Sequence, residues 1–156
     1  VYRMLPGDVA AMASLDQARP ENATLTFSVR LGADGDICDY RVQPIIVSGL
    51  RRRTFEDIDG ELAGGTWSKI KAMADRHRHF RQSRGHVAAD LPRPNVRVTE
   101  DGVVQLKDSP TDSPARAVIA ECMVMAGRVA ALYAVDHRLP LPFRYHLEPD
   151  TPRVTP

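Results

Sequence analysis

The sequence has only two cysteines, Cys38 and Cys122, which lie far apart and form no CxxC pair. Neither a disulfide framework nor a zinc site is therefore indicated, and a reducing, cytoplasmic setting is expected. No apolar run reaches the roughly 18 to 20 residues that a membrane span needs, and the start lacks the pattern of a secretory signal. The net charge is only +1, so no overall field draws the molecule onto nucleic acid. We expect a soluble protein with no membrane partner.

The length and composition indicate one globular domain. The chain has 156 residues, of which 43% are hydrophobic and 26% charged, and such a chain can bury a core. It begins with VYRMLP, without an initiator methionine, and ends with DTPRVTP, which is neither a helix end nor a polar tail. We expect the chain to be a piece of a longer protein.

Alternating apolar and polar residues predict two β-hairpins. The first spans residues 23–47, where ATLTFSVRL and ICDYRVQPIIV alternate on either side of the turn GADGD. The second lies in NVRVTEDGVVQL and turns at Asp101-Gly102, and a short strand is also expected around VAAD, residues 87–90.

Three helices are predicted from capping residues and helical periodicity. Thr54 caps a short helix that begins FEDIDGEL and ends at Gly64 and Gly65. A second helix runs from Thr66 to about Arg84, and its apolar row includes Trp67, Ile70, Met73 or Ala74, His77 and Phe80. Ser113 and Pro114 open a long helix that continues to about His137. Strands and helices in this order favour an α+β fold over a doubly wound sheet.

Candidate metal ligands are present but poorly arranged. In EDIDGE, Glu56 and Asp59 can share one helix face, but Asp57 and Glu61 point elsewhere, which favours a solvated helix start over a metal site. The histidines of HRHF and His86 lack the i, i+4 pair and the acidic partner of a helical zinc site. No GxSxG, P-loop or GxGxxG motif occurs. The motifs therefore support neither a nucleophile elbow nor a nucleotide cradle.

Basic residues gather in two places in a chain that is otherwise balanced. The helix at 66–84 carries six of them, and Arg51, Arg52 and Arg53 form a second cluster. Such clusters can hold the phosphates of a nucleic acid without reading its sequence. A solvated helix face is the alternative explanation for the first cluster.

The long helix carries two charges in an apolar setting. Glu121 and Arg128 are seven residues apart and project from nearly the same side. Polar side chains on a buried helix line a cavity or make a structural ion pair, and the sequence alone favours the pair.

Five segments follow one another along the chain in a recognisable order, namely MLPGDVAAMASL, TFSVRLGADGDICDYRVQP, LRRRTFEDIDGEL, FRQSRGHVAADLP and VIAECMVMAGRVAALYAVDHRLPLPFRYHLEP. Together they resemble, in matching order, the RNB catalytic domain of ribonuclease II and ribonuclease R exoribonucleases. The run VIAECMVMAGRVAALYAVDHRLPLPFRYHLEP resembles the family's long helix and the loop that follows it. MLPGDVAAMASL resembles its PMLP entry, and TFSVRLGADGDICDYRVQP resembles its paired strands around a DGxI turn. LRRRTFEDIDGEL and FRQSRGHVAADLP resemble its RLTYED helix start and its WRxxxGAI segment. The resemblance covers nearly the whole chain.

The resemblance implies a hydrolase that degrades single-stranded RNA from the 3′ end and releases nucleoside 5′-monophosphates. In the family, an aspartate cluster, DxxxxxDxDD, holds Mg²⁺, which activates water and offsets charge on the scissile phosphate. That motif precedes the PMLP segment and is absent here, as is the TSPIRRY motif that follows the PFR loop. Residues 1–156 are therefore expected to be the central part of an RNB catalytic domain, with no catalytic residue or metal ligand of their own and no activity alone.

The sequence departs from the family at several positions. Phe55 stands where the family often has a tyrosine that senses the ribose, and Ala88 and Ala89 lie where an aromatic residue clamps the terminal bases. Ala120 replaces the first member of an acidic pair, which leaves Glu121 alone. These losses keep open the alternatives of an RNB-like module that binds RNA without cutting it, and of a purely structural domain.

The resemblance and the basic clusters together give a set of candidate RNA contacts. In the PLPF loop, Arg144 can either grip a phosphate or hold the loop onto the helix. The expected partner is single-stranded RNA, and the sequence leaves the oligomeric state open. The candidate RNA-binding residues are Phe55, Arg78, Arg81, Glu121, Arg128, Arg144 and His146.

Overall fold

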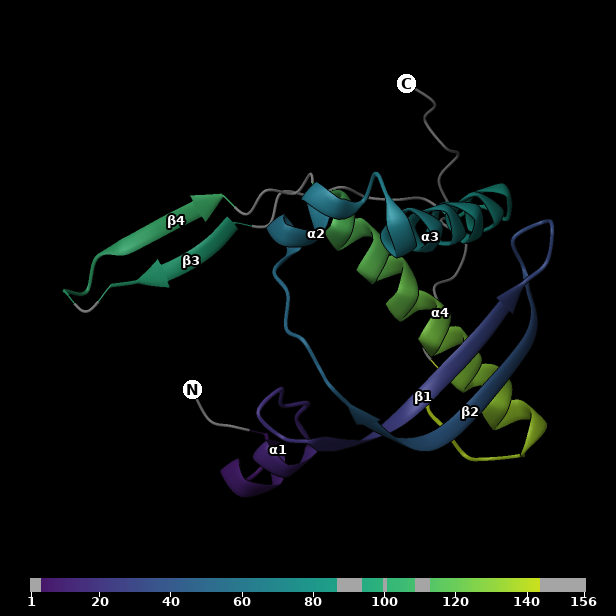
Figure 1. The fold of residues 1–156 in the computed structure, drawn as a ribbon, viewed down its shortest axis with the longest axis horizontal. Coiled ribbons are helices and arrows are strands. Elements are labelled where there is room, and N and C mark those ends of the chain that lie inside the picture. Colours follow the sequence, from purple (N-terminus) through teal and green to yellow (C-terminus); the bar gives the residue numbers. More distant parts are fainter. Residues whose placement is uncertain (1–3, 87–93, 100, 109–112, 144–156) are drawn as a thin grey trace.

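The computed structural model describes residues 4–86, 94–99, 101–108 and 113–143. Within these ranges the fold is α+β, as predicted, with helices and two separate antiparallel hairpins, of which the first packs against a helix (Figure 1). The expected strand at 87–90 lies outside the described residues. The elements are α1 (Gly7–Ala13), β1 (Glu21–Leu31), β2 (Ile37–Ser48), α2 (Phe55–Glu61), α3 (Gly65–Ser83), β3 (Pro94–Val98), β4 (Val104–Asp108) and α4 (Pro114–Asp136).

The first hairpin forms where alternation predicts it, with slightly longer strands. Strands β1 and β2 pair antiparallel from Glu21↔Ser48 to Arg30↔Asp39, and a bulge follows Arg30. At the tip, Gly35 has φ +89°, and a Cβ built there would lie 2.6 Å from the Arg76 carbonyl oxygen on α3. Only glycine therefore fits at this position, where the hairpin tip meets α3.

Capping residues fix the starts of α2 and α4. The Thr54 side chain accepts from the Asp57 N–H, and the Asp57 carboxylate accepts from the Thr54 N–H, which completes a capping box. Ser113 caps α4, with Pro114 in the first turn. The Ala115 N–H also donates to Asp59 Oδ1 at 2.6 Å, which ties the start of α4 to α2.

The core lies where α2 and α3 pack against the first half of α4. Phe55, Trp67, Ile70 and Cys122 pack around its edge. The second half of α4 crosses the β1–β2 hairpin (Figure 1). The buried members of the core are Ile58, Leu62, Ala74, Ala115 and Val118.

Helix α4 is more apolar than the sequence analysis allowed. Within its 23 residues, an 18-residue stretch reaches a mean hydropathy of 1.7, which by length and composition alone is enough to cross a membrane. A core helix of a soluble protein passes the same test. Here α4 packs against α2, α3 and the β1–β2 hairpin.

Two further elements complete the described chain. Helix α1 follows Pro6 and was not predicted from the sequence. The β3–β4 hairpin turns at Asp101-Gly102 as predicted, with Gly102 at φ +75°. Figure 1 shows this hairpin extending away from the other elements.

Candidate functional site

A buried polar cluster joins α3 to the middle of α4. Glu121, on α4, is 4% exposed, and its Oε1 lies 2.5 Å from Nδ1 of His77. Nη1 of Arg81 donates to both carboxylate oxygens, at 3.1 and 3.0 Å. Burial of a carboxylate is costly unless it is paired and hydrogen-bonded, and both conditions hold here. We call Glu121, His77 and Arg81 the α3–α4 polar cluster.

His77 is the centre of this cluster because of its place on α3. It falls on the apolar row that faces α4 and has no exposed surface. Its Nδ1 can donate to Glu121, which leaves Nε2 to accept from Nη1 of Arg128, 3.5 Å away. One imidazole therefore connects two charged residues of α4.

The predicted ion pair between Glu121 and Arg128 is wrong. Nη2 of Arg128 lies 2.6 Å from Oδ1 of Asp36, at the tip of the β1–β2 hairpin. Seven residues on a helix correspond to about 10.5 Å along its axis, which is too far for a direct contact here. Glu121 instead pairs with side chains of α3, and Arg128 pairs with Asp36 of the hairpin tip. Ion pairs therefore connect α4 to both α3 and the β1–β2 hairpin.

The two predicted basic contacts on α3 are occupied by protein groups. Nη1 of Arg78 lies 3.3 Å from Asp75, and Nη2 donates to the Ala117 carbonyl oxygen at 3.2 Å. Nη2 of Arg81 lies 2.7 Å from Nε2 and 2.9 Å from Nδ1 of His86. Desolvation is the main cause that lowers the pKa of His86, and the positive charge of Arg81 lowers it further. The lowered pKa favours a neutral His86 ring, which can accept a hydrogen bond from Arg81.

An open groove lies beside the cluster, between the end of α3, α4 and the hairpin tip. Its volume is about 590 Å³. The Phe80 ring forms one wall, and the guanidinium carbons of Arg84 and Arg128 lie 5.2 and 5.3 Å from the ring centroid. Arginine and aromatic side chains suit the phosphates and base faces of a single strand. We call this the Phe80 groove, and it is lined by Asp36, Phe80, Arg81, Arg84, Gly85, His86, Val124 and Arg128.

The structure brings together only some of the predicted RNA contacts. Arg81 and Arg128 line the Phe80 groove, and Glu121 lies behind it. Phe55 packs at the core with Arg116 over its ring, and Arg116 is twelve residues, or about 18 Å of helix, from Arg128. Arg144 and His146 lie outside the described residues. Contact of any of these residues with RNA stays a prediction.

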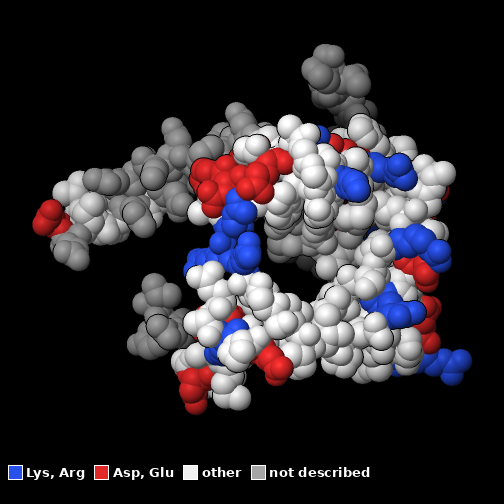
Figure 2. All heavy atoms as spheres, viewed as in Figure 1, with Lys and Arg blue, Asp and Glu red and all other residues white. Residues whose placement is uncertain are grey.

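Much of the apparent positive charge is neutralised inside the chain. Ion pairs engage Lys71 and Arg78 on α3, and Arg53 pairs with Asp57 and Glu61 of α2. Figure 2 shows this acidic patch directly beside the basic linker between β2 and α2. Some basic side chains have no carboxylate partner within the described ranges, namely Arg41, Arg51, Arg52, Lys69, Arg76 and Arg138.

Carboxylates in the described part of the chain are not arranged around a metal site. No group of three or more His, Cys, Asp or Glu side chains there could hold a metal ion. Asp57 and Glu61 pair with Arg53, Asp36 pairs with Arg128, and Asp59 accepts from the α4 backbone. The described residues therefore do not fit a Mg²⁺ site.

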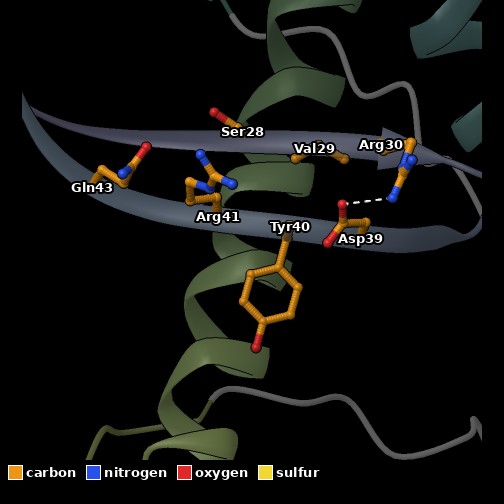
Figure 3. A pocket seen from close by; sticks show the side chains of 7 residues that line it. All are labelled: Ser28, Val29, Arg30, Asp39, Tyr40, Arg41 and Gln43. Atoms are coloured by element: carbon orange, nitrogen blue, oxygen red, sulfur yellow. Dashed lines mark hydrogen bonds and ion pairs between the residues drawn. The ribbon is translucent and has the colours of Figure 1, made fainter.

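The β1–β2 hairpin presents a polar face away from α4. Ser28, Arg30, Asp39, Arg41 and Gln43 lie around a shallow pocket, and Arg30 bonds Asp39 at 2.7 Å (Figure 3). Both members of this ion pair are well exposed, and such pairs add little stability.

On the opposite face of the hairpin, Tyr40 points toward the end of α4 (Figure 3). Its hydroxyl donates to the Asp136 carboxylate. This hydrogen bond, together with desolvation, raises the pKa of Tyr40 to about 12. Nearby, the rings of Tyr133 and His137 stack with centroids 3.9 Å apart. Tyr40 therefore fastens the hairpin to the second half of α4.

Comparison with known proteins identifies the family. Residues 1–155 match the RNB domain. The chain belongs to the RNB domain family. The match to this RNB domain covers the α3–α4 polar cluster, the Phe80 groove and both hairpins, and it confirms the resemblance drawn from the sequence.

Two relatives of this RNB chain carry nuclease names. A protein named as an uncharacterised ribonuclease of Synechocystis sp. is 32% identical over 82% of the chain. The protein named exoribonuclease II, mitochondrial, of Schizosaccharomyces pombe is 27% identical over 92% of the chain. The chain spans 20% of the length of each relative.

Sequence reasoning missed several residues of this RNB site. A histidine on the apolar row of α3 signals a buried polar partner, and His77 could have been found in that way. Phe80 and Arg84 lie one turn apart at the end of the same helix, as an aromatic and a cation that can stack. Asp36 gives no signal, because only the tertiary fold brings a hairpin tip to α4.

Proposed function

We propose that the chain is the central part of the catalytic domain of a hydrolytic exoribonuclease. The whole protein degrades single-stranded RNA from the 3′ end and releases nucleoside 5′-monophosphates. The RNB match over residues 1–155 carries this proposal, and the nuclease names of both relatives support it. The proposed setting of the enzyme is cytoplasmic.

In this proposal the described residues guide RNA and hold the domain in shape. Arg84 and Arg128 beside Phe80 offer guanidinium groups to phosphates and an aromatic face to a base. The α3–α4 polar cluster fixes the direction of Arg81 at the wall of the same groove. Glu121 thus has a structural role as the anionic partner of Arg81. A direct contact of Glu121 with RNA is the alternative.

The proposed cofactor is Mg²⁺. It would stabilise charge on the scissile phosphate and activate a water molecule. Because the described residues do not fit such a site, no step is assigned to them beyond binding and orientation.

The proposal is tested with the full-length protein that contains this chain. It is incubated with single-stranded RNA labelled at the 5′ end, with Mg²⁺ or with EDTA, and the products are separated by size. The expected result is a label on progressively shorter oligonucleotides, with 5′-monophosphates released only when Mg²⁺ is present. A label that appears at once on a mononucleotide would overturn the 3′ direction.

A matched substrate control uses the same RNA with a blocked 3′ end, which should be resistant. Internal fragments from this substrate would show an endonuclease instead. Tight binding of RNA without any product would favour the alternative of an inactive RNB-like RNA-binding module.

A further inference from the structure

The linker between β2 and α2 carries three consecutive arginines with different surroundings. Arg53 pairs with Asp57 and Glu61. Arg51 and Arg52 are exposed, and neither side chain has a hydrogen-bond or carboxylate partner in the part of the chain that the structure describes. Two adjacent guanidinium groups therefore remain available to an outside anion, although the acids of α2 lie close by.

These two arginines form one side of a pocket of about 400 Å³. The opposite side comes from the loop after α1, where Leu15, Asp16 and Gln17 line the pocket. The Arg52 N–H donates to Oε1 of Gln17 at 3.1 Å, which joins the linker to this loop. Leu50 completes the lining, so the pocket combines cations with apolar surface.

A buried asparagine holds the loop side of the pocket in place. Asn22 is 3% exposed, accepts from the Asp16 N–H at 2.9 Å and donates to the Asp16 carbonyl oxygen at 3.0 Å. Because both hydrogen bonds involve the Asp16 backbone, the loop side of the pocket is held in position without a bound ligand.

The one carboxylate in the lining does not cancel the two arginines. Oδ1 of Asp16 accepts from the Ala18 N–H at 2.9 Å, and Oδ2 lies 4.0 Å from Nε of Arg19. Asp16 is thus turned toward its own loop and balanced by Arg19. The net charge that faces the pocket is positive.

The surface around the linker is hollowed. Figure 2 shows a dark recess beside the basic linker, between the helices above and the hairpin below. Figure 1 shows that the linker bridges these two layers.

We propose that Arg51 and Arg52 bind successive phosphates of single-stranded RNA, with Leu15 and Leu50 against the sugar or base between them. This inference rests on the proposed function and adds a second contact region to it. Guanidinium groups pair bidentately with phosphate, and each phosphate contact releases counterions from a single strand. An acidic segment of the polyglutamate kind has no flat, uncharged ring to place against the two leucines, so the lining favours RNA over such a segment.

The test compares two double variants of the full-length protein. Arg51→Gln with Arg52→Gln removes the proposed contacts. Lys69→Gln with Arg138→Gln removes the same charge from two exposed positions that also lack a carboxylate partner among the described residues. Binding of a fluorescent single-stranded RNA is measured by anisotropy in EDTA over a range of salt concentrations, so that no cleavage occurs. Thermal melting confirms that each variant is folded.

The linker variant should lower the slope of log affinity against log salt by about 1.4, since each phosphate contributes about 0.7. If the linker variant and the wild type bind RNA equally at 1 M salt, this difference in slope makes the variant bind about 25-fold more weakly than the wild type at 0.1 M salt. The control variant should retain the wild-type slope. Equal losses in both variants, or an unchanged slope in the linker variant, would overturn the inference while the exoribonuclease proposal stands.

Two further outcomes separate the possible failures. A wild-type protein that neither binds nor degrades RNA would refute the proposed function and this inference together. If polyglutamate displaces RNA from the wild type and binds as tightly, and the linker variant loses both equally, the pocket is a site for acidic protein segments and the RNA inference fails.

Discussion

Glu121 shows how a charge on an apolar helix is stabilised by the fold. Its carboxylate has almost no exposed surface and is satisfied by Arg81 and His77. Glu121→Gln keeps the size of the side chain but leaves Arg81 without its anionic partner. Removal of one member of a buried pair costs about 3 kcal/mol. We expect this loss in the stability of the α3–α4 unit, measured by hydrogen exchange of its amides in the full-length protein.

The control for that change is Asp39→Asn on the β1–β2 hairpin. It also removes one carboxylate from an arginine, but both partners are exposed to solvent. Its effect on hydrogen exchange should be small. Equal protection of the α3–α4 amides in both variants would show that Glu121 has no structural role.

Tyr40 makes the stability of the protein depend on pH in the alkaline range. Because its pKa is raised from 10.0 to about 12, the folded protein holds the phenol proton more tightly than the unfolded chain does. The resulting stability is fully present below about pH 10 and is lost as the pH rises toward 12.

Tyr40→Phe keeps the ring but removes this proton and its bond to Asp136. Between about pH 10 and 12 the denaturant midpoint of the wild type should therefore fall more steeply than that of the variant. Parallel pH profiles would contradict the role given to the Tyr40 hydroxyl.

Helix α2 depends on a capping box rather than on a strong helical sequence, since it has only seven residues. Thr54→Ala removes the acceptor for the Asp57 N–H and should destabilise α2 by about 1 kcal/mol. Amide exchange in α2 reports this loss directly. Thr66→Ala, in the first turn of α3, is the matched control because the Thr66 side chain makes no hydrogen bond among the described residues, and its effect should be smaller.

The local elements could be predicted because their signals are local. Thr54, Ser113 and Gly102 act within a few residues of their own positions, and the helix and turn boundaries they indicate agree with the structure to within one or two residues. The partners of charged residues could not be predicted in the same way. The pairing of Arg128 with Asp36 joins positions 92 residues apart, and it requires the hairpin tip to reach α4. Helix periodicity instead suggested a pair between Glu121 and Arg128.

The distribution of charge over the whole molecule also differs from its distribution along the sequence. The basic run of α3 appears in the sequence as the main RNA surface, but Lys71, Arg78 and Arg81 are paired with acids. Arg51 and Arg52 form a shorter run that stays unpaired within the described ranges. Affinity for a polyanion depends on the charges left available after folding. The linker should therefore matter more for RNA binding than its short length suggests.

This division between structural and available charges is tested most directly by steady-state RNA degradation and thermal melting of the full-length protein. Glu121→Gln should lower the Tm and leave the KM for single-stranded RNA of the folded fraction unchanged. The Arg51→Gln, Arg52→Gln variant should raise KM and leave the Tm unchanged. A raised KM with an unchanged Tm in Glu121→Gln would place Glu121 against RNA and contradict its assignment to the α3–α4 polar cluster.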